Sequence, residues 1–363
     1  MDRSVQGLAG EGVRSVAEWL GQGAPPEDSR GVRLAPESPL AHFLAAAPWC
    51  GHPSAQGWWL APASGAVRRC VAPNGWSVQA KFYWLKVGDD ALVAAERERA
   101  YTACAAPLLG AGPYAAVEVY GQWAGVLFLA HVPGPTLLEV IQGQPRAPSA
   151  AAPGFLPLPI ADGIEAVTRL LARLHGEERG LPAEVSTYDD ASYFANYGKK
   201  VVANLAKHGV LAPAPALAQS LSRAIDGWQE GALLADFPRV FAHGDATVSN
   251  FILPGDGAVV AIDWERARAS DPAADLGRLC AEVRHSCDEH LQGAAGVVAA
   301  EVVRQVYAAT WCGRGDAVSR LLERARYHEG VSLLRIARNG WLSRELRQAR
   351  CEQALGLLRL RSA

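Results

Sequence analysis

The chain has 363 residues, half of them hydrophobic, so it can form one large domain or two unequal ones around a sizeable core. Its formal net charge of -2 gives no overall attraction to nucleic acid or to an anionic membrane. Its seven cysteines are scattered without a CxxC pair, which favours reduced thiols, and neither a signal peptide nor a membrane-spanning run is expected. The composition therefore predicts a soluble cytoplasmic protein.

The first part of the chain predicts a helical extension followed by a small antiparallel sheet. Residues 1–56 contain two candidate helices, near residues 12–20 and 39–47, separated by a break rich in Pro, Gly and charge. Residues 57–88 contain three runs rich in aromatic and β-branched side chains, the last of them at 78–87. Gly and Pro turns separate these runs, which is typical of strands.

The next segment predicts one helix and two further strands. Residues 89–109 begin with two acidic residues and are rich in alanine, which favours a helix. Strands are expected at 114–121 and 124–132, where β-branched and apolar residues gather. Residues 142–163 are rich in Pro, Ala and Gly and predict a loop, after which helices are expected over most of the remaining chain.

One stretch in the helical part differs from its surroundings. In NFILPGDGAVVAID, two apolar runs flank a Pro-Gly-Asp-Gly turn and predict a β-hairpin. Asn250 and Asp263 then lie at the open end of the hairpin, and Asp245 precedes it. An amide and a carboxylate oxygen suit a hard cation such as Mg²⁺, and a third group can orient an attacking hydroxyl. Taken singly, these residues could equally be turn caps.

The motifs around this hairpin resemble those of a known superfamily. HGDATVSN has the D-x-x-x-x-N spacing of the kinase catalytic loop, and it is followed by IDWE and DPAADL. Together with LARLHG further upstream, this order resembles the aminoglycoside phosphotransferase and choline kinase superfamily, which is related to protein kinases. The resemblance covers roughly residues 57–290, and the ordered combination is specific.

The resemblance implies an α+β, bilobal protein-kinase-like fold. A small antiparallel N-lobe with one key helix would bind nucleotide at residues 57–132. A larger, mostly helical C-lobe at 133–363 would carry the catalytic hairpin and bind the acceptor, while residues 1–56 would be an extension. The implied activity is transfer of a phosphoryl group from ATP, or GTP, to a hydroxyl group with the help of Mg²⁺.

The resemblance also implies roles for individual residues. Asp245 would be the catalytic base or hydroxyl-orienting group, and Asn250 and Asp263 would be the metal ligands. His243 and Asp275 would be structural, the former by bonding backbone around the loop and the latter by bracing it from the next helix.

Three further acidic residues are candidates for substrate contact. Glu265 would face metal or substrate, and Asp189 and Asp190 could line a site for a cationic acceptor.

The nucleotide-binding residues are less well defined. A strand lysine held by a helix glutamate is expected to bind the nucleotide phosphates. Lys81 and Lys86 would point to opposite faces of the strand, so only one of them can enter the cleft. The segment FYWLKV resembles the strand that carries this lysine in the family, which favours Lys86. Glu98 is the preferred partner and Glu96 the rival.

Backbone contacts complete the expected nucleotide site. Ser64 and Gly65 would approach the phosphates in place of a GxGxxG loop. The segment from Leu129 through His131 to Val132 resembles the hinge that holds adenine by its backbone.

The acceptor is less defined than the donor. The resemblance favours a hydroxylated natural product, an antibiotic or a sugar, with choline-type or other metabolic kinases, a pseudokinase scaffold and a protein kinase as alternatives. From Asp316 onward ten arginines accompany five acidic residues, either as solvated helix faces or as a cleft wall. The second interpretation predicts an acceptor that is not strongly polycationic. A monomer or homodimer is expected.

Overall fold

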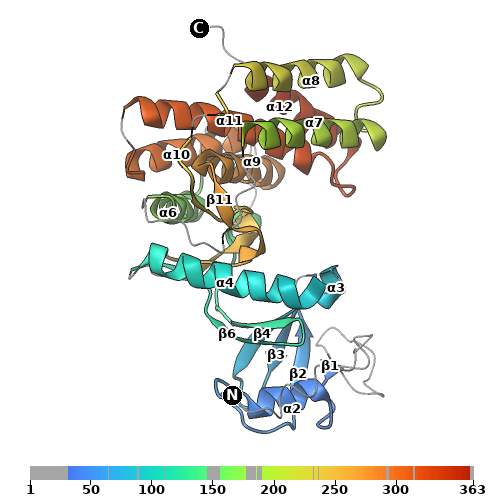
Figure 1. Ribbon diagram of the computed structural model, residues 1–363, viewed down its shortest axis with the longest axis vertical. Coiled ribbons are helices and arrows are strands. Elements are labelled where there is room, and N and C mark those ends of the chain that lie inside the picture. Colours follow the sequence, from blue (N-terminus) through green and yellow to red (C-terminus); the bar gives the residue numbers. More distant parts are fainter. Residues whose placement is uncertain are drawn as a thin grey trace. The chain divides into compact units, whose positions relative to one another are not determined.

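The computed structural model describes residues 32–63, 65–87, 90–110, 112–144, 156–176, 185, 190–231, 233–235, 237–291, 294–313 and 315–359. They form two compact units (Figure 1). The first holds the described residues up to Ala103 together with Val117–Val132, and the second holds Cys104–Ala116 and the chain from Pro133 onward. The candidate helix at 12–20 lies outside the described residues. Within them, no helix has the length and hydrophobicity needed to cross a bilayer.

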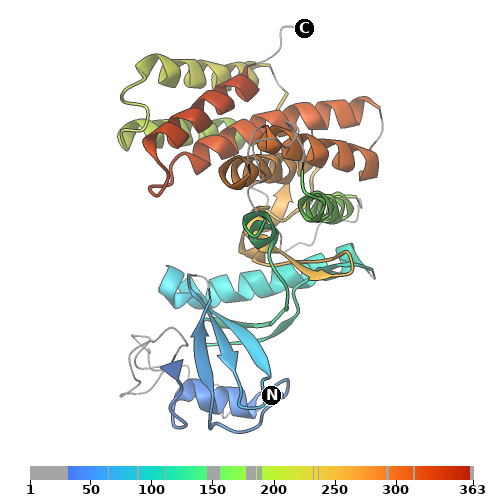
Figure 2. The ribbon, with the colours of Figure 1, turned by 180° about the vertical axis from the view of Figure 1, so that it is seen from behind.

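The first unit is built on a six-stranded sheet, which Figure 2 shows from behind. Its strand order is β1-β2-β3-β4-β7-β6, and each neighbouring pair is antiparallel. The strands are β1 (Val32–Arg33), β2 (Trp59–Pro62), β3 (Val67–Val71), β4 (Ser77–Phe82), β6 (Val119–Trp123) and β7 (Val126–Ala130). The antiparallel sheet expected from the sequence is thus confirmed.

Helix α2 (Pro39–Ala46) shares one hydrophobic core with this sheet. The side chain of Ser38 accepts a hydrogen bond from the backbone N–H of Ala41 and caps the helix, which typically stabilises a helix by about 1 kcal/mol. Leu40 and Leu44 are fully buried in the same cluster as Phe128 of β7. The segment expected to be an extension therefore contributes to the core of the first unit.

The run expected as one strand over 78–87 ends earlier than predicted. Strand β4 stops at Phe82, which pairs with Val126, the first residue of β7. The chain then turns into the short helix α3 (Trp84–Val87), in which Val87 N donates to Tyr83 O at 2.8 Å. The partner chain turns at Ala124 and Gly125, so the ladder ends after one further bond, from Tyr83 N to Gly125 O at 2.9 Å. Helix α4 (Ala91–Leu109) follows.

The second unit is mostly helical, as expected. Its helices are α5 (Leu137–Gln142), α6 (Leu158–Leu174), α7 (Ala191–Lys207), α8 (Pro215–Glu230), α9 (Pro272–His290), α10 (Ala295–Thr310), α11 (Asp316–Ile336) and α12 (Arg344–Leu358). Helices α7, α8, α11 and α12 enclose one hydrophobic core (Figure 1). Helix α6 begins inside the segment expected as a loop, because proline is tolerated in the first turn of a helix.

Two small sheets complete the second unit. Strands β9 (Phe251–Gly255) and β10 (Ala258–Ala261) form the predicted hairpin, and β5 (Tyr114–Ala116) pairs in parallel with β10. The strand expected at 114–121 is therefore two strands, β5 and β6, which belong to different sheets. The second sheet pairs β8 (Val240–Ala242) with β11 (Arg268–Ser270).

Candidate active site

The loop that carries Asp245 is closed at its base by a strand pair. Ala242, the last residue of β8, lies opposite Arg268, the first residue of β11, so the chain between them forms a closed excursion. Gly244 has a φ of 77°, which favours glycine, and a Cβ at this position would overlap the carbonyl oxygen of Arg266. The glycine of the HGD motif is therefore required by the close approach of two backbone segments.

Asp275 of α9 braces this loop. Its carboxylate accepts the backbone N–H of His243 at 2.6 Å and that of Gly244 at 2.9 Å, and it lies 3.2 Å from Nε2 of His175. Although burial raises the pKa of Asp275, hydrogen bonding and electrostatic interaction with His175, together with the interactions of His243, outweigh it and lower the pKa to about 2. These contacts agree with the bracing expected for Asp275.

His243 ties the loop to the end of the hairpin. Its Nε2 lies 2.9 Å from the carbonyl oxygen of Ile262, and its Nδ1 accepts the backbone N–H of Asp245 at 3.3 Å. Because a carbonyl can only accept and the Asp245 N–H can only donate, Nε2 is the donor and Nδ1 the acceptor in these two contacts. His243 thus bonds backbone on both sides, as expected from the motif.

Asn250 and Asp263 lie at the open end of the hairpin, where the sequence predicted them. The side-chain nitrogen of Asn250 donates to the carbonyl oxygen of Asp245 at 2.9 Å, so the oxygen Oδ1 is the atom left to contribute to a cation. The backbone of Asn250 also accepts the N–H of Ile262 at 3.0 Å, next to Asp263. The loop that carries Asp245 and both ends of the hairpin are thus one hydrogen-bonded structure.

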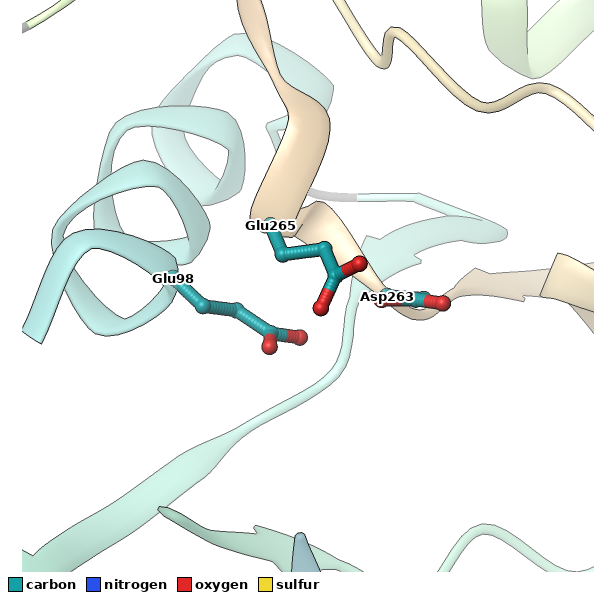
Figure 3. A group of neighbouring side chains, drawn as sticks. All are labelled: Glu98, Asp263 and Glu265. Atoms are coloured by element: carbon teal, nitrogen blue, oxygen red, sulfur yellow. The ribbon is translucent and has the colours of Figure 1, made fainter. Parts of the chain in front are cut away.

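Asp263 has a left-handed backbone, with φ 64° and ψ 59°. A non-glycine residue rarely adopts this conformation, and its cost of about 1 kcal/mol or more is typical of functional positions. Figure 3 shows Asp263 and Glu265 on the turn that follows β10, and one carboxylate oxygen of each lies within 4.8 Å of the other. This turn brings two hard oxygen donors together.

Asp245 lies among arginines that sequence reasoning missed. Arg278 of α9 donates Nη1 to its carboxylate and also to Gly244 O at 3.1 Å, while Arg335 of α11 approaches to 3.6 Å and Arg266 to 3.8 Å. Burial raises the pKa of Asp245, but these arginines, Arg278 most strongly, bring it below its usual value. Asp245 is therefore a carboxylate at neutral pH.

The first unit contains the expected ion pair between a lysine and Glu98, but the lysine is Lys81 and not Lys86. Lys81 on β4 lies 2.6 Å from Glu98 of α4, and both side chains are buried. Tyr83 donates its hydroxyl to the same carboxylate. Glu98 projects from α4 (Figure 3), whereas Glu96 pairs with Arg99 on the exposed face.

The expectation that Lys86 is the strand lysine held by the helix glutamate is wrong. Lys86 lies on the exposed helix α3 because the strand ends at Phe82. The choice of Glu98 over Glu96 agrees with the ion pair.

The remaining candidates have the following positions. Gly65 lies in the turn between β2 and β3 with a φ of 56°, and Ser64 lies outside the described residues. Leu129 is buried on β7, and Nδ1 of His131 lies 3.2 Å from the side-chain nitrogen of Gln79. Their contact with nucleotide remains a prediction.

Asp189 and Asp190, the two acidic candidates for substrate contact, precede α7. Asp190 caps α7 by accepting the N–H of Tyr193 at 2.6 Å, and Asp189 lies outside the described residues. A capping carboxylate is committed to the backbone, so the structure gives Asp190 a structural role.

A cavity of about 800 Å³ opens beside Asp245 in the second unit. Its charged lining consists of two carboxylates and four arginines: Asp245, Glu282, Arg266, Arg335, Arg338 and Arg347. It also contains Tyr197 and Thr247, whose hydroxyl groups can bond a polar ligand. The arrangement can hold a polar molecule against the carboxylate of Asp245.

Comparison with known proteins identifies the family. The model of the phosphotransferase enzyme family matches residues 88–315, while no curated protein matches the chain. Similar solved structures include the ADP-bound aminoglycoside phosphotransferase APH(2'')-Ib, with 14% identity, 83% of this chain and 93% of that chain covered, and a TM-score of 0.53.

Two other solved structures share the fold. An ethanolamine kinase from Plasmodium vivax has 14% identity, with 88% of this chain and 86% of that chain covered and a TM-score of 0.53. A type I macrolide 2'-phosphotransferase has 16% identity, with 86% and 95% covered and a TM-score of 0.53. These structures confirm the kinase-like fold. Because the family match spans more than half of the chain, this protein belongs to the phosphotransferase enzyme family.

Proposed function

We propose that this protein transfers the terminal phosphoryl group of ATP, or of GTP, to a hydroxyl group of a natural product, an antibiotic or a sugar. The observation that carries the proposal is Asp245, a carboxylate on a loop braced by Asp275, at the wall of a cavity of about 800 Å³. Phosphoryl transfer needs mainly positioning and charge neutralisation, and this loop supplies the first.

Asp245 would orient the attacking hydroxyl. Its lowered pKa keeps it ionised, so it can accept a hydrogen bond from the acceptor and take up the proton once the hydroxyl acidifies during transfer. Arg278 holds the carboxylate through Nη1 and limits its rotation. Lys81, fixed by Glu98, is the group that would bind donor phosphates in the first unit.

The hairpin end fits a magnesium ion. Asn250 would contribute Oδ1 and Asp263 a carboxylate on a constrained turn, and Glu265 lies close to Asp263. These are hard oxygen donors of the kind that Mg²⁺ prefers. When bound, the ion would supply positive charge to the donor phosphates. The chain's own part is to present the oxygens on a turn with little freedom.

The cavity supports an acceptor that is not a polyamine. Among the described residues that line it, four arginines outnumber two carboxylates. A site for several ammonium groups needs the opposite balance, because like charges that face one another cost free energy. This balance also disfavours choline and amino alcohols, although the similar structures include an ethanolamine kinase.

An acceptor screen tests the proposal. Purified protein is incubated with ATP and Mg²⁺ and a panel of hydroxylated compounds, and products are read by mass for one added phosphoryl group. Asp245→Asn, which keeps the shape but removes the charge, is the matched control and should lose about 100-fold or more in kcat. Nucleotide binding without any phosphorylated product would favour a pseudokinase, and efficient phosphorylation of a generic protein would favour a protein kinase.

A further inference from the structure

We propose that the acceptor carries a carboxylate or phosphate group beside its reactive hydroxyl, and that the arginines of the cavity bind this group. The inference rests on the proposed function, since it assumes that the cavity beside Asp245 receives the acceptor. It extends that function by giving the acceptor a negative charge.

The four arginines converge on the cavity from separate elements. Arg266 ends the turn after β10, Arg335 lies in the last turn of α11, Arg338 lies on the turn that follows α11, and Arg347 lies on α12. Side chains distant in sequence thus face one space. Such convergence differs from a solvated helix face, where arginines of one helix point into water.

Two of these arginines are held in place by polar contacts. Arg347 donates Nε to Asn339 O at 3.1 Å and Nη2 to Arg338 O at 3.4 Å, which fastens the turn that carries Arg338. Arg335 lies 3.6 Å from both Asp245 and Glu282, and only 20% of its side chain is exposed. The guanidinium groups are therefore partly ordered before a ligand arrives, which lowers the entropy cost of binding.

The local acids offset only part of this positive charge. Asp245 is already bound by Arg278, the third arginine at this carboxylate besides Arg266 and Arg335. Glu282 lies 3.6 Å from Arg335, so its charge is directed at one of the four guanidinium groups. A planar guanidinium fork binds carboxylate and phosphate oxygens in pairs, so an anionic oxo group is the ligand that this lining suits.

An alternative role for the arginines is contact with the phosphoryl group in transfer. Arg266 and Arg335 contact Asp245 and could act on any acceptor. The described contacts of Asp245 do not include Arg338, which is exposed and lines the same cavity. Arg338 is therefore the position at which recognition of the acceptor can be separated from chemistry.

The test compares acceptors that differ in one charged group. Sugars, nucleosides and other hydroxylated compounds are each assayed as the neutral alcohol, as its carboxylate, as its phosphate ester and as its amine. The enzyme variants are Arg338→Gln and the matched control Arg344→Gln, an exposed arginine of α12 that is absent from the cavity lining. Comparing the carboxylate with the phosphate ester of each compound shows which of the two anionic groups the cavity prefers.

We expect kcat/KM to be about tenfold or more higher for the anionic forms than for the neutral ones, as a charge-assisted hydrogen bond implies. Arg338→Gln should reduce this preference about tenfold and leave neutral acceptors within about twofold. Arg344→Gln should change neither. Direct calorimetric binding of the preferred anionic acceptor without nucleotide should weaken in the same variant.

Three results would overturn the inference. Equal losses for neutral and anionic acceptors would assign Arg338 to phosphoryl transfer or to folding. A preference for neutral or amino forms would leave the proposed function intact but remove the anionic acceptor. Binding of an anionic compound that is unchanged by Arg338→Gln would place its site elsewhere. If no acceptor is phosphorylated while ATP binds, the proposed function fails, and the calorimetric arm then decides the anion site by itself.

Discussion

Replacing Asp275 by Asn should loosen the catalytic loop. The carboxylate holds the backbone N–H groups of His243 and Gly244 at 2.6 and 2.9 Å, whereas an amide would turn its own N–H₂ group toward one of them. The pKa of Asp275 is about 2 against an ordinary 3.8, a difference worth about 2 kcal/mol. Leaving a buried N–H without an acceptor costs a further 1–3 kcal/mol or so, and part of this overlaps with the first term. We therefore expect a loss of about 3 kcal/mol.

Urea unfolding at neutral pH, followed by tryptophan fluorescence, measures this loss. Asp226→Asn is the control, because Asp226 forms an exposed ion pair with Lys199 at 2.8 Å and should matter by less than about 0.5 kcal/mol. The catalytic rate of Asp275→Asn should fall at least about tenfold, since Asp245 is positioned by the same loop. A loss below about 1 kcal/mol with normal turnover would refute the bracing argument.

The lowered pKa of Asp275 also predicts how the stability difference between wild type and Asp275→Asn changes with pH. Because the folded state favours the ionised carboxylate, its contribution is complete above pH 3.8 and is lost as the pH falls toward 2. The stability difference between wild type and Asp275→Asn should therefore stay constant from neutral pH down to the ordinary pKa and shrink only below it. A difference that already narrows near neutral pH would point to another group.

Three further predictions concern other residues. Lys81→Met should weaken ATP binding by about tenfold or more, while Lys86→Met should leave it within about twofold. Asp263→Asn should raise the Mg²⁺ concentration needed for half-maximal activity, and an unchanged titration would remove Asp263 from the metal site. Burial and neighbouring arginines lower the pKa of His328 to about 3, so protonation of the unfolded chain below 6.5 favours unfolding. Wild type should lose about 2 kcal/mol between about pH 7.5 and 5 through this group, and His328→Gln should not.

The sequence predicted the hairpin and its loop because their signals are local. Backbone conformations with positive φ, which few residues adopt, occur at the Gly and Asp residues of the hairpin turn and at the glycine of HGD. The bracing contacts of His243 and Asp275 agree with the roles that the resemblance implied.

The errors arise where tertiary structure decides. The choice of Lys86 assumed that β4 continues to the end of an aromatic run, but strand length depends on the partner strand, which begins at Val126. Arg278 and Arg335 were missed because they lie on α9 and α11, far from Asp245 in sequence. One signal was present for Arg278, since it follows Asp275 by three residues and so shares its helix face.

The arginine-rich C-terminal part is not one kind of surface. Arg335 and Arg338 are three residues apart, but α11 ends at Ile336, so a turn carries Arg338 toward the cavity. Arg324 and Arg350 are instead buried in ion pairs with acidic residues, and Arg344 is exposed. A count of charges along the chain does not distinguish arginines that line the cavity from those in buried ion pairs or those exposed to solvent. Under the proposed function, the arginines that face the space beside Asp245 are those expected to influence which acceptor is phosphorylated, and the turn between α11 and α12 is therefore the place to look for specificity.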